Sequence, residues 1–167
     1  MPTVERGRKL YEGKWKVLFE TEDPARVILR FKDVPAFDRT AVRPKLPRRG
    51  AMKARIAATL FGLLQQRGIS THFLELQGER EMLVRRLEMI RLEVVIRNVV
   101  AGSLAKRLGM EAGTPLPVPV LEYSYKSDAL GDPLVNETHI QALGLASPEE
   151  IRGIREMAFR AHGTVLP

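Results

Sequence analysis

The chain has 167 residues, of which 44% are hydrophobic, and its formal net charge is +7. This length and composition predict a globular protein with one compact domain or two small lobes. We expect neither a membrane span nor a signal peptide, because no apolar run is long enough and the first residues lack an apolar core. The sequence contains no cysteine, which excludes disulfides and thiolate metal sites and favours a cytoplasmic protein.

The basic charge raises the question of a polyanionic partner. The densest basic cluster runs from Lys45 to Arg49 and continues with Lys53 and Arg55, but no aromatic residues are interleaved there to stack on bases. Elsewhere the basic residues are mixed with acidic ones. These features favour a solvated basic surface with small phosphate ligands over a nucleic-acid-binding domain, which is the more distant alternative.

Residues Lys14–Phe19 alternate and then turn apolar, which predicts a strand directly after Gly13. On a pleated strand Lys14 and Lys16 would share one face, roughly 7 Å apart. Two ammonium groups on one face suit a polyphosphate ligand. The alternative is a pair of solvent-exposed lysines on an edge strand.

The next elements predict the rest of an antiparallel sheet with one helix. Val27–Phe31 is expected to be the hairpin partner of the first strand, and Lys32–Pro47 is expected to be a polar, proline-rich loop. Thr71–Leu76 and Met82–Leu87 predict two further strands. Gly50–Arg67 predicts a helix that packs on the core through an apolar stripe at Met52, Ile56, Leu60, Phe61 and Leu64.

The stretch Leu92–Gly109 predicts a strand that feeds directly into a helix. The junction consists of small residues, so a ligand can approach the backbone, and Ser103 is expected to cap the helix. Arg97 lies just upstream and can add a guanidinium to the same site. Together they outline an anion site, most naturally for a phosphate. The alternative is an ordinary capped helix beside a surface arginine.

Beyond that helix, residues Gly113–Val120 contain several prolines and are expected to form an extended connection, neither a regular helix nor a central strand. Lys126, Asp128 and Asp132 then fall in a short polar segment that ends in Asp-Pro. Carboxylates here suit a magnesium ion or the orientation of an amine, although Asp-Pro is also a common turn.

The last predicted element is a helix that starts after Ser147. Ser147 as cap, Pro148 in the first helical position and Glu150 as the returning carboxylate form a helix-start pattern.

Two segments, Glu93–Asn98 and Ala101–Gly109, together resemble the signature of the phosphoribosylaminoimidazole-succinocarboxamide synthase (SAICAR synthetase) family of purine biosynthesis. The resemblance extends to Leu10–Lys14, to Lys126–Asp128 and to Asp132-Pro133. It implies an α/β (α+β) fold of two lobes with nucleotide bound between them. Residues 1–87 would form an antiparallel-sheet lobe, and residues 88–167 an incomplete, ATP-grasp-like lobe.

The resemblance also implies an activity, the ATP- and Mg²⁺-dependent ligation of L-aspartate to the carboxylate of carboxyaminoimidazole ribonucleotide. The resemblance does not identify the metal ligands. It is compatible with a monomer and with a homo-oligomer. The implied roles are ATP binding for Gly13, Lys14, Lys16, Arg85 and Met89, substrate binding for Glu93, Arg97, Ser103, Lys126 and Asp128, and catalysis near the reacting carboxylate or the metal for Asp132.

The sequence departs from the family pattern in three respects. Trp15 stands where a small residue is expected, and Lys53 and Ala54 stand where the family carries asparagines. Family members also continue beyond this chain with an acidic segment that supplies metal ligands. We therefore expect a truncated chain with little synthetase activity of its own, and the alternative function is that of a catalytically inactive nucleotide-binding fragment.

Overall fold

The computed structural model describes residues 4–33 and 48–166. The chain divides into two compact units, Met1–Glu88 and Met89–Pro167. Most of the loop predicted at Lys32–Pro47, and with it Lys45 of the basic cluster, lies outside the described residues.

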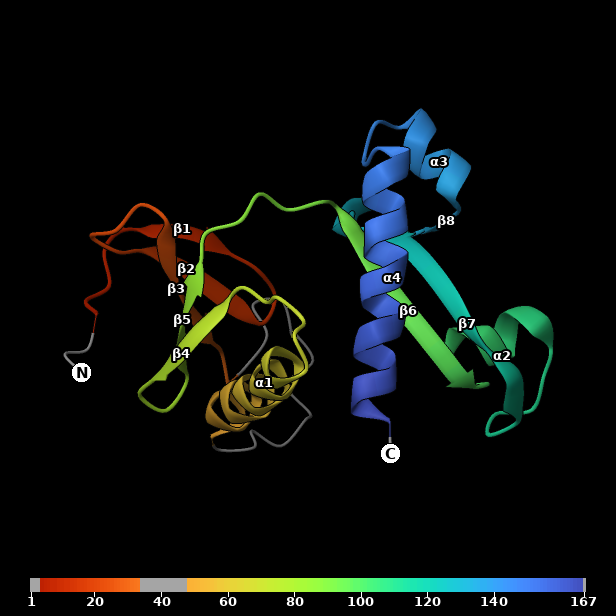
Figure 1. The fold of residues 1–167 in the computed structure, drawn as a ribbon, viewed down its shortest axis with the longest axis horizontal. Helices are drawn as coiled ribbons and strands as arrows, with labels where there is room; N and C mark the ends of the chain where they lie inside the picture. Colours follow the sequence, from red (N-terminus) through yellow and green to blue (C-terminus); the bar gives the residue numbers. More distant parts are fainter. Residues whose placement is uncertain (1–3, 34–47, 167) are drawn as a thin grey trace. The chain divides into compact units, whose positions relative to one another are not determined.

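The first unit is built on a five-stranded sheet in the order β1-β2-β3-β5-β4, in which every neighbouring pair is antiparallel (Figure 1). The predicted N-terminal antiparallel sheet is confirmed, but the sequence did not reveal its outermost strand, β1. The strands are β1 (Lys9–Glu12), β2 (Lys16–Glu20), β3 (Arg26–Phe31), β4 (Phe73–Gln77) and β5 (Glu81–Arg85).

Helix α1 (Arg49–Gln66) covers one face of this sheet (Figure 1). The predicted apolar stripe is wrong in part, because Met52, Ile56 and Leu60 are exposed. Small residues face the strands instead and allow the helix backbone to lie close to them. The helix residues that pack on the sheet core are Ala54, Ala57, Ala58 and Phe61.

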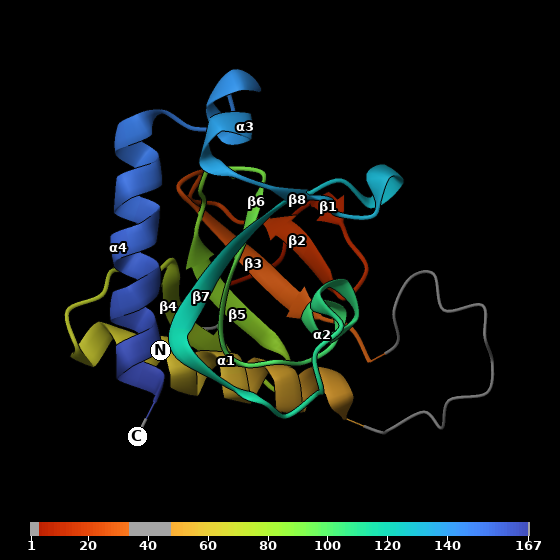
Figure 2. The same ribbon diagram turned by 90° about the vertical axis from the view of Figure 1, so that its right-hand side faces the viewer.

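The second unit contains a three-stranded antiparallel sheet of β6 (Leu92–Val99), β7 (Pro115–Tyr125) and β8 (Leu134–Val135). Figure 2 shows β7 as a long, curved strand. The expectation that residues 113–120 form an extended connection and no central strand is therefore wrong from Pro115 onward, because β7 is the middle strand of this sheet. Strand β8 pairs only with Tyr123 and Ser124, so within the described residues the proline-containing part of β7 has no strand on its outer edge. Proline is tolerated on such an edge because no amide is required there.

Helices α3 (Glu137–Ala142) and α4 (Pro148–Val165) cover one face of this second sheet, and α4 packs along β6 (Figure 1). Their core contains the buried residues Tyr123, Ile140 and Ile151. The predicted helix start is confirmed, because Ser147 and Glu150 form a capping box. None of the helices in the described ranges has both the length and the apolar character that a membrane crossing requires.

Candidate functional site

Strand β6 has one apolar face and one polar face. Leu92 and Val94 pack into the core beneath α3 and α4, so the alternating residues Glu93 and Arg97 point to the opposite face of the sheet. Glu122 of β7 pairs with Val95 of β6 and lies on this same polar face. The register therefore places a carboxylate diagonally across from Arg97.

Two arginines converge on that carboxylate. Arg97 donates from Nε to Glu122, and Arg107 of α2 (Ser103–Leu108) donates to its other oxygen. The Glu122 side chain is only 11% exposed. Burial alone would raise the pKa of Glu122, but the hydrogen bonds from Arg97 and Arg107 outweigh it and hold the pKa below its ordinary value. One carboxylate between two guanidinium groups leaves a net positive charge, which suits a second anion.

Ser103 joins this cluster, although not in its predicted role. Helix α2 begins at Ser103, and its N-cap is Gly102, with φ 54° and no side-chain capping hydrogen bond. The prediction that Ser103 caps the helix is wrong, because Gly102 adopts a positive φ that suits glycine. Ser103 Oγ instead accepts a hydrogen bond of 3.4 Å from Arg97 Nη2. The predicted pair of phosphate-binding residues is thus brought together by a direct contact.

A second cluster lies on the same face, at the other end of β6. Lys126 Nζ is 3.0 Å from Glu93 Oε2 and 3.8 Å from Asp132 Oδ2. The hydrogen bond with Glu93 raises the pKa of Lys126, and the charges of Asp132 and Asp128 add to this effect. Arg97 lies four positions after Glu93 along the strand, which corresponds to roughly 13 Å. The polar face therefore presents two charged clusters, one at each end.

Asp132 is held in an unusual backbone conformation. Its φ is 51°, a left-handed value that few residues other than glycine adopt. The carboxylate Oδ1 accepts a hydrogen bond of 2.8 Å from the backbone N–H of Ser127. This bond fixes the turn in which Lys126, Asp128 and Asp132 lie together.

The carboxylates of this cluster do not form a metal site with the residues described. Nowhere in residues 4–33 and 48–166 do three His, Asp or Glu side chains gather closely enough to hold a metal ion. Lys126 occupies the space between Glu93 and Asp132 and neutralises part of their charge. We therefore assign no magnesium ligand in this part of the chain.

The residues predicted to bind ATP phosphates lie at the turn between β1 and β2. The N–H of Gly13 donates to the Lys16 carbonyl at 2.9 Å and closes this turn. Lys14 precedes β2, which begins at Lys16, so the prediction that both lysines share a strand face is wrong. Pairing between β1 and β2 extends to Glu12 and Val17, and the turn closed by Gly13 leaves Lys14 outside the strand. Desolvation by surrounding protein atoms lowers the pKa of the Lys16 ammonium.

The remaining predicted nucleotide residues lie near the end of the first unit. The guanidinium of Arg85 donates from Nη1 to the Thr71 carbonyl at 2.8 Å. Met89 begins the second unit, and its side chain is exposed. His72 packs edge-on against the Phe61 ring, with centroids 4.9 Å apart, and burial lowers its pKa, as fits a structural residue of the core.

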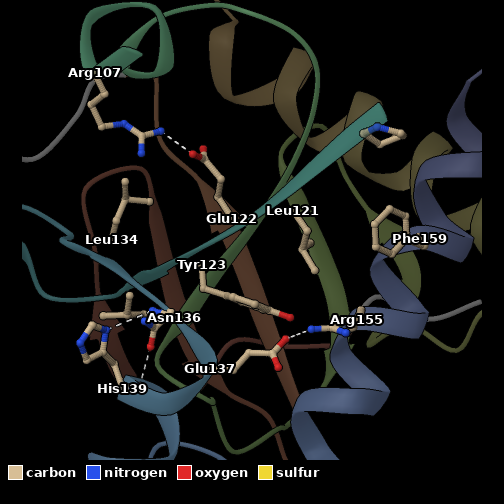
Figure 3. Close-up of a pocket in the computed structure, with 12 residues that line it drawn as sticks. Arg107, Leu121, Glu122, Tyr123, Leu134, Asn136, Glu137, His139, Arg155 and Phe159 are labelled. Atoms are coloured by element: carbon tan, nitrogen blue, oxygen red, sulfur yellow. Dashed lines mark hydrogen bonds and ion pairs between the residues drawn. The ribbon is translucent and has the colours of Figure 1, made fainter. Parts of the chain in front are cut away.

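A cavity of about 720 Å³ opens at the outer edge of β7 (Figure 3). None of the predicted site residues lines it. Two pairs of polar residues in its wall contact each other, Glu137 with Arg155 and Asn136 with His139. Because no predicted site residue lies in the wall, we do not place the substrate there. Its wall does include Glu122 and Arg107, the two residues of the arginine cluster that the sequence did not reveal. Recognising β7 as a strand would have indicated Glu122 as a polar residue in an apolar run.

Comparison with known proteins gives one consistent result. A family model described as SAICAR synthetase matches residues 9–165. Phosphoribosylaminoimidazole-succinocarboxamide synthase of Brevibacillus brevis is 44% identical over 164 residues, which are 98% of this chain and 69% of that protein. The enzyme of the same name from Deinococcus radiodurans gives the same identity and coverage.

Solved structures agree with the sequence comparisons. The synthase of that name from Ehrlichia chaffeensis superimposes with a TM-score of 0.88 at 36% identity, and covers 95% of this chain and 67% of its own. A structure described as SAICAR synthetase (Type-2) in complex with ADP has a TM-score of 0.84 at 41% identity, with 93% and 66% covered. The chain thus spans about two thirds of the length of these relatives.

Proposed function

We propose, because this chain belongs to the SAICAR synthetase family, that it serves the ATP-dependent ligation of L-aspartate to the carboxylate of carboxyaminoimidazole ribonucleotide in purine biosynthesis. The observation that carries this proposal is the family match along residues 9–165. The paired contact of Arg97 with Ser103, inside the segment that resembles the family signature, supports it.

The chemistry requires activation of a poor electrophile. A carboxylate oxygen of the ribonucleotide attacks the γ-phosphorus of ATP. The bond between the γ-phosphorus and the oxygen that bridges it to the β-phosphate breaks, so ADP departs and the ribonucleotide carries an acyl phosphate. The amine of aspartate then attacks the acyl carbon and the phosphate departs. The amine loses a proton as the amide bond forms. The protein must therefore hold the γ-phosphate of ATP and the amine of aspartate close to the carboxylate of the ribonucleotide.

Arg97 and Ser103 are suited to the ribonucleotide phosphate. Arg97 uses Nε for Glu122 and one N–H for Ser103, and its remaining guanidinium donors are available for an anion. Glu122 fixes the plane of the guanidinium and so orients these donors. Ser103 adds a hydroxyl donor beside them.

The cluster of Lys126, Glu93 and Asp132 is suited to the reacting end of the ribonucleotide. Lys126 keeps its positive charge because Glu93 and Asp132 lie beside it, so it can attract a substrate carboxylate. Glu93 would contact the ribonucleotide. Asp132, with Asp128 in the same turn, supplies a carboxylate that can orient the aspartate amine.

ATP is assigned to the first unit and to the connection that follows it. Gly13, Lys14 and Lys16 would contact its phosphates, and Arg85 and Met89 its nucleoside. The structure described in complex with ADP supports nucleotide binding in this family. Magnesium is expected with the phosphates, but no described residue is assigned as its ligand.

The test is a coupled assay of ADP release by the purified chain. Release that depends on both L-aspartate and the ribonucleotide is expected of a synthetase. Release that ignores either co-substrate would contradict the proposal. Binding of both nucleotides without any turnover would favour the alternative, a nucleotide-binding chain that lacks the chemistry.

A further inference from the structure

Trp15 lies in the turn between β1 and β2 with two cationic groups against its ring. Lys53 Nζ is 3.3 Å from the ring centroid, and Arg49 Cζ is 4.5 Å from it. The carbonyl of Trp15 accepts a hydrogen bond of 2.8 Å from the N–H of Lys32, which fixes the turn to the end of β3. Cations near an indole face are attracted by its negative quadrupole.

The start of α1 is held at the same end of β3. A Cβ on Gly50 would lie 2.7 Å from the Phe31 carbonyl oxygen, so only glycine allows this approach. The Gly50 N–H also donates to Asp33 Oδ1 at 2.8 Å. Residues 49 and 53 are one helical turn apart, and this docking brings both of them to the indole ring.

Within residues 4–33 and 48–166, no acidic side chain forms an ion pair with the cations around Trp15. Lys16 follows Trp15 in the chain and is the first residue of β2. Its Nζ lies 5.5 Å from the centroid of the Phe31 ring. Among the described residues, Lys16, Arg49 and Lys53 have no acidic partner. Desolvation lowers the pKa of Lys53, and the charges of Arg49 and Lys16 lower it further. Like charges one helical turn apart are destabilising, so the cluster costs stability when it is empty.

We propose that Lys53, held against the Trp15 ring, binds the same nucleotide phosphate chain as Lys16. This inference rests on the proposed function, because it takes the ATP assigned to Lys16 as the ligand. Trp15 acts as a positioning residue that places the Lys53 ammonium, and it need not touch the nucleotide. A phosphate chain carries several negative charges and so compensates the repulsion among Lys16, Lys53 and Arg49.

Trp15 offers a direct readout, because it is the only tryptophan of the chain. ADP and ATP should change its fluorescence in a saturable titration, since the phosphate draws Lys53 partly away from the ring. Calorimetry on Lys53→Met should show affinity for both nucleotides reduced by about fivefold or more, as expected for a lost charge-assisted contact.

Arg55→Met is the matched control. Arg55 is exposed on the same helix, and its removal changes the net charge equally. A change below about twofold is expected for this variant. Equal losses for Lys53→Met and Arg55→Met would overturn the proposal, because the effect would then be one of overall charge.

A double-mutant cycle tests the role of Trp15. Trp15→Phe keeps a ring and should retain most of the affinity, whereas Trp15→Ala should lose about as much as Lys53→Met. The double variant with both Trp15→Ala and Lys53→Met should lose little more, since one variant already displaces the same ammonium. Additive losses would contradict a positioning role.

Lys16→Met separates this inference from the proposed function. If Lys16→Met loses nucleotide binding and Lys53→Met retains it, the role of Lys53 is rejected while the ATP assignment stands. Absence of nucleotide binding in the unaltered chain would instead reject the ATP assignment itself.

Discussion

Arg97 of β6 and Glu122 of β7 lie diagonally across the polar face of the second sheet and are joined by a hydrogen bond from Arg97 Nε. The carboxylate is shared with Arg107, so neither arginine is fully neutralised. This arrangement orients Arg97 toward Ser103 while leaving donors for a ligand. It connects the register of two strands to the proposed phosphate site.

Replacing Arg97 by Met should weaken ribonucleotide binding by about tenfold or more, because a charge-assisted pair worth roughly 1.5–3 kcal/mol is lost. ATP affinity should change little, since the proposed ATP contacts lie elsewhere. Calorimetry with each nucleotide separates the two effects. Arg152→Met, an exposed arginine on α4, serves as a control of equal charge. Equal weakening of both nucleotides in Arg97→Met would count against the phosphate assignment.

Glu122→Gln should lower the free energy of unfolding at neutral pH by about 1–3 kcal/mol, because two guanidinium groups lose their shared carboxylate. The folded-state pKa of Glu122 is depressed, so its contribution is complete above the unfolded-state pKa and is lost as the pH falls through the folded value. The difference between Glu122→Gln and the unaltered chain should therefore shrink on acidification below about pH 4. Urea unfolding at several pH values measures it. A difference that stays constant into acid would show that the ion pairs are not its source.

The polar face could be predicted only in part from the sequence. The sequence predicted the strand that carries Glu93 and Arg97, but the packing of Leu92 and Val94 and the register with β7 placed both side chains on the face shared with Glu122. Glu122 was not predicted as a site residue, because Pro115, Pro117 and Pro119 indicated an extended connection just before it. Their tolerance depends on an unpaired outer edge of β7, which is a property of the assembled sheet.

Contacts between distant segments were the other source of error. The hydrophobic pattern of α1 favoured a stripe of large residues, whereas close packing on β3 selected Gly50 and Ala54. Likewise Trp15 stood out as an unexpectedly large residue, but only the docking of α1 shows that its ring meets Lys53. Local signals such as the Ser147 capping box were predicted correctly, because their partners lie within one helical turn.

Replacing Lys16 by Ala should weaken ATP more than the ribonucleotide, because Lys16 is a partly desolvated ammonium with no acidic partner among the described residues. Raising the salt concentration should weaken ATP binding more in the unaltered chain than in Lys16→Ala. The reason is that the variant has one charge contact fewer for salt to screen. Lys106→Ala, in the other unit, is the control. Unchanged ATP affinity in Lys16→Ala would mean that this lysine is only a surface charge.

Two glycines of α1 give opposite predictions for the same substitution. In Gly50→Ala the new methyl group would lie 2.7 Å from the Phe31 carbonyl oxygen, a backbone atom that cannot move without shifting β3. We expect a loss of about 1–3 kcal/mol in the free energy of unfolding, as for other overpacked positions. In Gly62→Ala the methyl group meets no atom within 4 Å, and the helix should gain about 0.5–1 kcal/mol from lower backbone entropy in the unfolded chain. Urea unfolding followed by circular dichroism measures both variants. A neutral Gly50→Ala would show that α1 does not approach β3 as closely as described, and Trp15 fluorescence in that variant would show whether Lys53 still reaches the ring.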